Sequence, residues 1–392
     1  MKDVAELLAP YPLLTLAQAS DNAEILDFLD RIDMKTARGG IKFSRRPDFF
    51  ALQAAQAETA LTFLMKNPDG ELTGTAVYAI TPMRVRGHEE KVAYTCDLRL
   101  SPRINRRTRL QFRDIYVDAT RHAHTIAEFG GARTIITSIF DENAAAISTL
   151  VGKKEGRARD MVYRPVFPYH NITVLGRLPL SRALVTHRVE RCPTALVNQL
   201  LAFLDSNPEQ SELTFSMREL WRRQSVIGFR WEDFLVVLDQ NGEIQAAGLP
   251  VSDEKFRKLV LQGLGAGLRT AGELLPLLGR PALREGEPLR TAYLGFLKIR
   301  ARSPQEHEDL LASLLHRYLD LEREKPIGER YHNIVVMEPQ ARHLDQRLRL
   351  KGLITMSLPA TVYQVVHRAN HQKRYLLRKR PHQRMDFEVG FA

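Results

Sequence analysis

Two segments of the chain alternate apolar and small residues in the manner of a β-hairpin. They are Leu61–Tyr78 (LTFLMKNPDGELTGTAVY) and Phe234–Pro250 (FLVVLDQNGEIQAAGLP). Each has an apolar strand, then an Asp-Gly pair (69–70) or an Asn-Gly pair (241–242), and then a strand of small residues. Asp-Gly and Asn-Gly accommodate the positive φ angles of tight hairpin turns. The pattern therefore predicts two similar hairpins far apart in the chain.

The same succession of strand, amphipathic helix and strand follows each hairpin. In order, the expected elements are Val92–Leu100, Leu110–Phe129 and Thr134–Phe140 in the first half, and Thr291–Ile299, Gln305–Leu321 and Asn333–Met337 in the second. The two Ala-Tyr pairs at 93–94 and 292–293 are 199 residues apart. Apolar residues recur at helical spacing in both predicted helices. The second helix also begins with a capping box, Ser303-Pro304-x-Glu306.

Each half is then expected to end with a short helix and closing strands of its own. The short helices end at residues 154–156 and 351–352. The closing strands are Met161–Phe167 in the first half, and Ile354–Met356 with Val362–Val366 in the second. The second half also carries an insertion around Phe256–Pro288. We therefore predict an internal duplication of an α+β unit.

This pattern predicts an α+β protein with two similar domains. Each domain should hold a mixed, mostly antiparallel sheet with a βαβ crossover and flanking helices. The expected divisions are residues 1–178, residues 179–366 and a basic C-terminal tail of residues 367–392. The length of 392 residues agrees with two or three domains.

Composition excludes several classes of protein. Hydrophobic residues make up 44% and charged residues 26%, as in ordinary globular proteins. No stretch approaches the roughly 20 apolar residues that span a bilayer. Two cysteines, Cys96 and Cys192, are too few for a disulfide framework. We expect a cytoplasmic protein without a membrane segment, and the sequence leaves its oligomeric state open.

The net charge of +11 indicates an anionic partner, and its distribution narrows the choice. Residues 368–384 hold seven Lys/Arg and no acid, which is typical of a solvated tail or of a contact with RNA or another polyanion. A second cluster lies between a predicted strand and helix. It consists of Arg99, Arg103, Arg106, Arg107, Arg109 and Arg113. A milder basic group, Lys35–Arg46, precedes Pro47.

These elements and motifs resemble the GNAT (Gcn5-related N-acetyltransferase) superfamily, in tandem. The motifs are Arg46-Pro47-Asp48-Phe49-Phe50, Leu98-x-Leu100-x-Pro102, and Asp141-Glu142-Asn143 with Ala146 and Lys154-x-Gly156. In the second half the resemblance rests on element order and on residues 347–353 (RLRLKGL).

The resemblance implies that acyl-CoA binds between the two parallel strands of one copy. Its pyrophosphate would meet backbone N–H groups at the following helix N-terminus. The implied contacts are Leu98, Leu100, Asn105, Arg106, Arg107, Thr108, Arg109, Leu110 and Asn143. The glycines usual in this loop are missing from residues 105–110, and residues 302–308 (RSPQEHE) place acids there. We therefore expect at most one acyl-CoA site, in the first copy. The arginines there would either replace part of the lost backbone contacts or grip a polynucleotide.

Two residues on the first strand of that slot are candidates for catalysis. The resemblance places Asp97 as a general base and Tyr94 near the substrate. Their alternatives are a strand carboxylate paired with an arginine, and a core tyrosine. No metal is expected, because His122 and His124 point to different faces of a helix and lack further ligands nearby. Trp221 and Trp231 flank two arginines and would either stack on a ligand or lie in the core.

Three functions are compatible with these observations. The first is an N-acyltransferase, an acetyltransferase in the first instance, that moves an acyl group from acetyl-CoA or another acyl-CoA to an amine. The second is an aminoacyl-tRNA-dependent transferase, which the basic tail would suit. The third is a non-catalytic binding protein derived from the same fold. The acceptor is not encoded in any motif of the sequence.

Overall fold

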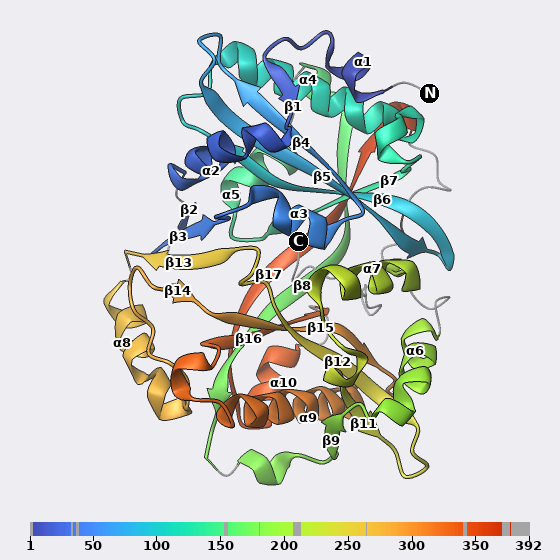
Figure 1. Ribbon diagram of the computed structural model, residues 1–392, viewed down its shortest axis with the longest axis vertical. Coiled ribbons are helices and arrows are strands. Elements are labelled where there is room, and N and C mark those ends of the chain that lie inside the picture. The colour runs from blue at the N-terminus through green and yellow to red at the C-terminus, as the bar shows by residue number, and fades with distance from the viewer. Residues whose placement is uncertain are drawn as a thin grey trace.

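The computed structural model shows two lobes, one above the other along the long axis (Figure 1). It describes residues 3–32, 34–36, 39–152, 156–179, 181–206, 213–263, 265–339, 343–370 and residue 377. The first copy of the repeat forms most of one lobe, and the second copy forms most of the other.

The first lobe contains the predicted hairpin and the crossover helix. Its elements are α1 (Val4–Leu8), β1 (Leu14–Leu16), α2 (Asn22–Asp30), β2 (Met34–Thr36), β3 (Gly39–Ser44), α3 (Phe49–Gln56), β4 (Thr59–Lys66), β5 (Leu72–Val85), β6 (His88–Leu100), α4 (Arg106–His122), β7 (Thr134–Phe140), α5 (Ala144–Ala146) and β8 (Met161–Arg177). Helix α4 starts four residues before the predicted helix, and two 3₁₀ turns replace its predicted end near Phe129. The hairpin turn uses Gly70 at a φ of 87°.

The second lobe repeats this order with an insertion. Its elements are β9 (Val189–Arg191), α6 (Val197–Asp205), β10 (Leu213–Phe215), α7 (Met217–Ile227), β11 (Leu235–Leu238), β12 (Ile244–Ser252), β13 (Lys258–Gln262), α8 (Ala266–Leu274), β14 (Pro288–Leu289), β15 (Thr291–Ile299), α9 (Pro304–Arg323), β16 (Asn333–Pro339), α10 (Leu344–Leu350) and β17 (Leu353–His367). Gly242 takes a φ of 79° in the second hairpin turn. The predicted α+β class is confirmed.

One large sheet runs through both lobes. Within the described residues its strand order is β1-β4-β5-β6-β7-β17-β8-β16-β15-β12-β11-β9, with β10 paired to β5. In the first lobe β4, β5 and β6 are antiparallel and β6 pairs β7 in parallel. In the second lobe β11, β12 and β15 are antiparallel and β15 pairs β16 in parallel. The two copies therefore have the same internal topology.

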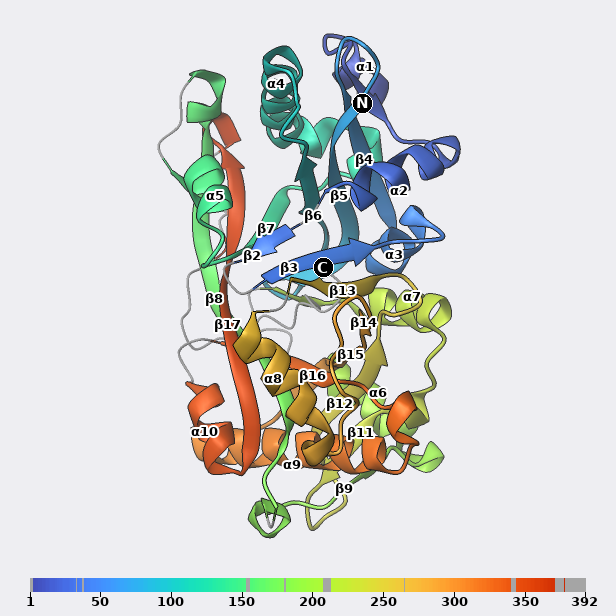
Figure 2. The same ribbon diagram turned by 90° about the vertical axis from the view of Figure 1, so that its left-hand side faces the viewer.

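The closing strands are arranged differently from the prediction. Strand β7 of the first copy pairs with β17 of the second, and β16 of the second copy pairs with β8 of the first. The expectation that each half is closed by its own last strand is wrong. The two copies exchange these strands, and β8 and β17 run antiparallel along much of the molecule (Figure 2). The predicted pair of strands in residues 354–366 is one continuous strand, β17, with two register shifts.

The insertion of the second copy joins the lobes through a second, smaller sheet. Its order within the described residues is β14-β13-β3-β2. Strand β13 of the insertion pairs antiparallel with β3 of the first lobe, and Leu259 lies opposite Phe43. Figure 2 shows β3 and β13 side by side where the lobes meet. The insertion therefore brings residues of the second copy next to the first.

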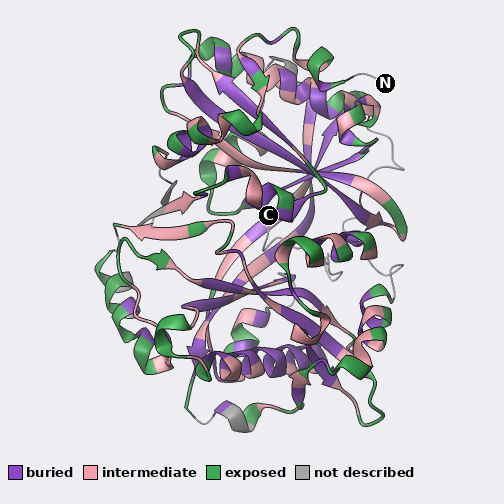
Figure 3. Ribbon diagram, viewed as in Figure 1, coloured by how far each residue is buried: buried purple, intermediate pink, exposed green. Residues whose placement is uncertain are grey.

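The buried side chains lie on the faces of the large sheet. Helix α4 covers one face of the first lobe, where Phe63, Tyr78 and Ile115 pack together. On the opposite face, Tyr94 and Phe167 belong to a separate buried cluster. Helix α9 covers the equivalent face of the second lobe and is buried along much of its length (Figure 3).

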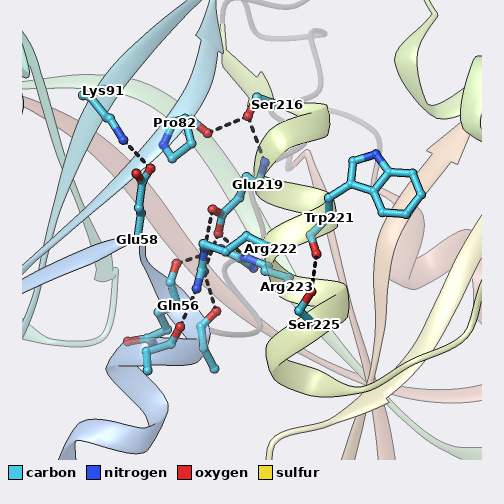
Figure 4. Close-up of polar contacts among 12 residues, drawn as sticks. Gln56, Glu58, Pro82, Lys91, Ser216, Glu219, Trp221, Arg222, Arg223 and Ser225 are labelled. Carbon is cyan, nitrogen blue, oxygen red and sulfur yellow. Dashed lines mark hydrogen bonds and ion pairs between the residues drawn. The ribbon is translucent and has the colours of Figure 1, made fainter.

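Two arginines of α7 join the lobes at the end of α3. Arg222 donates to the carbonyl oxygen of Ala55 at 3.0 Å, and Arg223 donates to that of Gln56 at 3.1 Å (Figure 4). Buried Glu219 accepts from both guanidiniums at 2.7 Å. The arginines thus satisfy carbonyl groups that the end of a helix leaves without an intrahelical partner. Trp221 and Trp231 on either side of them pack against each other with ring centroids 4.6 Å apart, and Trp221 is 46% exposed, so it does not lie in the core.

We predict that Arg223→Ala lowers the free energy of unfolding by about 3 kcal/mol, because it leaves Glu219 and a helix-end carbonyl buried with fewer partners. Arg218→Ala on the same helix is the matched control, since that side chain is exposed and its ion pair with Glu58 is worth less than about 1 kcal/mol. Chemical denaturation of both variants measures the difference. Equal losses in the two variants would contradict the role assigned to Arg223.

Candidate functional site

The two parallel strands of the first copy separate part-way along their length. Strands β6 and β7 are paired from Val92 opposite Thr134 to Thr95 opposite Thr137. Beyond this point β6 continues to Leu100 and β7 to Phe140 without further mutual pairing. Backbone groups on the facing edges are therefore available to an extended ligand, because each strand edge offers N–H and C=O groups.

Five residues separate the end of β6 from the start of α4, so the helix N-terminus lies at this opening. Asn105 caps the helix, and its side-chain oxygen accepts the N–H of Arg107 at 2.7 Å. The N–H of Asn105 donates to Asn67 Oδ1 at 2.9 Å. Thr108 is fully buried and donates to the carbonyl oxygen of Lys66 at 3.1 Å. Asn105 and Thr108 thus fix the helix start against the β4–β5 turn.

The arginines at this helix start form an exposed cationic surface. Four of them are exposed and have no ion-pair partner among the described residues: Arg103, Arg106, Arg107 and Arg109. The other two are engaged, since Arg113 pairs with Asp114 and Arg99 lies 3.7 Å from Asp97. Because a helix N-terminus also carries partial positive charge, the four free arginines and the helix end favour an anion.

The remaining predicted cofactor contacts lie near the opening. Leu98 and Leu100 at the end of β6 are half-buried and pack against the core beneath α4. Leu110 is 38% exposed, one turn into α4. Asn143 follows β7 and caps α5 by accepting the N–H of Ala146 at 3.0 Å. Residues 153–155, which include Lys154 of the predicted motif, lie outside the described residues.

Asp97 occupies a β-bulge at the point where the strands separate. Asp97 and Leu98 together face one residue of β5, Ala76, and Asp97 has a φ of 48°. Both of its carboxylate oxygens accept from Arg45 Nη2, at 3.0 and 2.7 Å. Burial alone would raise the pKa of Asp97, but the guanidiniums of Arg45, Arg99 and Arg257 hold it below its usual value. The carboxylate of Asp97 is therefore ionised and paired with an arginine, which was the alternative to a catalytic role. Its role as a general base stays a prediction.

Tyr94 points to the sheet face opposite α4. It is buried beside Val92, Ile136 and Phe167. Burial raises the pKa of Tyr94 well above its ordinary value, with smaller contributions from neighbouring Cys96 and Tyr169. At neutral pH the side chain therefore keeps its proton. Its predicted contact with substrate remains a prediction.

The second copy has the same backbone and different side chains. Phe296 takes the place of Asp97, with a φ of 45° and the same two-against-one bulge opposite Gly248. Strands β15 and β16 also separate, after Tyr293 opposite Val335. In this copy Ser303 caps α9 and Glu306 stands in its first turn. A buried His307–Glu338 contact of 3.4 Å links α9 to the end of β16.

Side chains of the second copy therefore accept the backbone N–H groups at the start of α9. The side chain of Ser303 accepts the N–H of Glu306 at 3.1 Å, and that of Glu306 accepts the N–H of Arg302 at 2.5 Å. A carboxylate at this position repels an incoming phosphate. The charges of the two copies thus favour an anion at α4 over one at α9.

Sequence reasoning missed two residues beside Asp97. Arg45 appeared only as one member of a basic group, and Arg257 lay in the insertion without any motif. The structure brings them together because β3 and β13 pair between the lobes. The repeated spacing of 199 residues aligns Phe296 with Asp97, so it could have indicated that the two positions share a backbone conformation. It gave no information about the side chains around them.

Most of the basic tail lies outside the described residues. Residues 368–370 form a 3₁₀ turn, in which Asn370 contacts the carbonyl oxygen of Arg121. Leu377 is buried in the cluster that holds Tyr94, and its N–H donates to Gln364 Oε1 at 2.9 Å. The prediction that residues 368–384 contact RNA remains untested.

The described residues hold no group of three or more His, Cys, Asp or Glu side chains placed to bind a metal ion. No helix among them combines the length and the apolar character that crossing a membrane requires.

Comparison with known proteins identifies the fold. No protein-family model matches the chain, and no curated protein matches it in sequence. Among solved structures, N-myristoyltransferase from Saccharomyces cerevisiae with bound myristoyl-CoA superposes with a TM-score of 0.54 at 11% identity, over 91% of this chain and 83% of that one. A GCN5-related glucosamine N-acetyltransferase region of a fungal multi-domain β-N-acetylglucosaminidase superposes with a TM-score of 0.52 at 12% identity, over 90% of this chain and 38% of that one. The chain shares its fold with these two structures, one of which is a GCN5-related N-acetyltransferase region. Both copies keep the bulged strand, and the start of α4 in the first carries four exposed arginines without ion-pair partners in the described part of the chain.

We predict that Asp97→Asn lowers the stability of the protein at neutral pH. The difference in stability between the variant and wild type should become smaller at acidic pH. The folded pKa of Asp97 is lowered, so its ion pair contributes stability above the unfolded value of about 3.9 and loses it as the pH falls through the folded pKa. Thermal unfolding of both proteins between about pH 3 and 7 measures this gap. A gap that stays constant over this range would show that the carboxylate does not act through its charge.

Proposed function

We propose that this protein is an N-acyltransferase whose first GNAT copy binds acyl-CoA and transfers the acyl group to an amine. The observation that carries the proposal is the start of α4. Four arginines without ion-pair partners among the described residues surround a helix N-terminus at the point where β6 and β7 separate. The fold supports it, since one structure of similar fold is an N-myristoyltransferase with bound myristoyl-CoA.

Each part of the cofactor has a place in this arrangement. The pyrophosphate would lie at the N-terminus of α4, with Arg106, Arg107 and Arg109 neutralising its charge. The pantetheine arm would lie along the free edge of β6, beside Leu98 and Leu100, where the strand offers backbone groups. The second copy would not bind cofactor and would border the acceptor instead.

The reaction forms one bond and breaks another. The nitrogen of a neutral amine attacks the thioester carbonyl carbon, a C–N bond forms, and the C–S bond breaks to release CoA. One proton leaves the amine and one reaches the thiolate. Tyr94 keeps its proton at neutral pH and is our candidate for the second transfer. Asp97, at the bulge where the strands separate, is our candidate for the first.

Calorimetric titration of CoA, acetyl-CoA and a long-chain acyl-CoA into the purified protein tests the proposal. We expect the double variant Arg106→Ala/Arg109→Ala to weaken the binding of all three by at least about tenfold, since each lost charge-assisted hydrogen bond is worth about 1.5 kcal/mol or more. Pantetheine lacks the pyrophosphate, so its binding should not change.

Arg121→Ala is the matched control, because it removes an exposed arginine at the opposite end of the same helix. It should leave CoA binding within about twofold of wild type. Failure of the wild-type protein to bind any CoA species at high micromolar concentration would overturn the proposal. An equal loss in Arg121→Ala would show that only net charge matters.

The titration also discriminates acetyl from longer acyl groups, which the arrangement of α4 leaves open. A ratio of affinities that rises with chain length would favour a long-chain donor, because each buried methylene contributes about 0.8 kcal/mol. A ratio near one would favour the acetyl donor expected from the sequence.

A further inference from the structure

One arginine at the boundary of the lobes is buried and incompletely paired. Arg45 stands directly after β3, and its side chain is 4% exposed. Its Nη2 donates to both oxygens of Asp97. Its Nη1 is buried and has no hydrogen-bond partner in the described part of the chain. A buried guanidinium N–H without an acceptor is costly, so this atom marks a place for one.

The groups around Arg45 come from both lobes and leave a positive charge. Arg99 lies on one side, 3.7 Å from Asp97. On the other side lies Arg257, which pairs with Asp253 and donates to the Tyr293 hydroxyl at 3.1 Å. Burial raises the pKa of Tyr293, so this hydroxyl stays neutral. The guanidiniums of Arg45, Arg99 and Arg257 are therefore balanced by only two carboxylates, those of Asp97 and Asp253. The pKa of Arg45 is lowered, mainly by burial. The ion pair with Asp97 opposes this effect, and repulsion from Arg257 and Arg99 adds to it.

An aromatic ring holds two of these cations in place. The ring of Phe43, on β3, has the guanidinium carbons of Arg99 and Arg257 at 5.7 and 6.0 Å from its centroid. The side chain of Arg99 is 23% exposed, so this group of residues reaches solvent on that side. Cation–π contacts of this kind fix guanidiniums at separations that mutual repulsion would otherwise increase.

We propose that Arg45 binds a carboxylate of the acceptor, so that the acceptor is an amine that also carries a carboxylate, such as a free amino acid. This proposal rests on the proposed N-acyltransferase function. Asp97 stands at the bulge where β6 leaves β7, so the positive site borders the place where the thioester would lie. A carboxylate accepting from Arg45 Nη1 would satisfy that N–H and neutralise the surplus charge.

The charge of the site favours a carboxylate over a phosphate. A carboxylate carries one negative charge, which matches the one unbalanced guanidinium. A phosphate monoester carries about 1.5 to 2 negative charges at neutral pH and would be repelled by neighbouring Asp97 and Asp253. A protein lysine side chain brings no carboxylate of its own and would leave Arg45 Nη1 without an acceptor.

Arg45→Lys tests the proposal without removing the charge beside Asp97. A lysine ammonium can pair with the carboxylate of Asp97 but lacks the second arm of the guanidinium fork. Arg46→Lys is the matched control, because Arg46 is the adjacent arginine and its ion pairs with Asp27 and Asp30 lie on the exposed surface. Thermal unfolding of both variants checks that each is folded.

The assay follows release of the CoA thiol with acetyl-CoA, or with the best-bound acyl-CoA, and compares the common amino acids with their amides. In parallel, calorimetry measures binding of the same pairs to the protein saturated with CoA. We expect wild type to prefer at least one acid over its amide by at least about 30-fold in kcat/KM and in affinity. Arg45→Lys should reduce this preference to below about threefold through KM, with the affinity for acyl-CoA unchanged, and Arg46→Lys should preserve it.

The outcomes separate the two proposals. If acyl-CoA fails to bind, the proposed function falls, and binding of acids against amides to the free protein decides the role of Arg45. If acyl-CoA binds but acids and amides are bound or acylated equally, the carboxylate site is wrong and the proposed function stands. A preference for acids that survives in Arg45→Lys, or that disappears equally in Arg46→Lys, also overturns it.

Discussion

The pairing of β8 with β17 is the interaction on which the rest of the structure depends. These strands are hydrogen-bonded from Leu353 opposite Arg177 to His367 opposite Met161. Their outer edges pair with β7 of one copy and β16 of the other, so each copy borrows a strand from its neighbour. Neither lobe can complete its own sheet alone, and their relative position is fixed by backbone hydrogen bonds. The small sheet of β3 and β13 then brings Arg257 to Asp97.

The local elements were predictable from sequence because they depend on local patterns. Alternation, turn dipeptides and capping residues specified the hairpins, β15 and α9 to within a few residues. The strand exchange was not predictable, because β8 and β17 have the same apolar character and could pair with either copy. Choosing between partners depends on pairings 160 or more residues apart in the chain, from Ile334 opposite Val174 upward, which a local pattern does not contain. The surroundings of Arg45 depend on the same long-range pairing.

The candidate site, like the fold, was predictable only where its residues are close together in the sequence. The arginines at the start of α4 were recognisable as a cluster because they are close in sequence. Their availability was not, since only the structure shows that Arg113 and Arg99 are engaged while Arg106 and Arg109 are exposed without described ion-pair partners. The acids at the start of α9 were also recognisable in the sequence, and Glu306 stands in the first turn of that helix. The His307–Glu338 contact behind them was not foreseen, because its members lie on different elements.

The bulge shared by Asp97 and Phe296 is a backbone feature that does not depend on the side chain at its centre. A left-handed conformation costs an ordinary residue roughly 1–2 kcal/mol, and neither residue is a glycine that would escape this cost. One position holds a charged group in an ion pair, while the other holds an aromatic ring packed in the core. No common side-chain chemistry explains a strained backbone at both, so the bend belongs to the repeated unit itself. Both copies therefore make the same forced turn and hold it with side chains of opposite character, one charged and one aromatic.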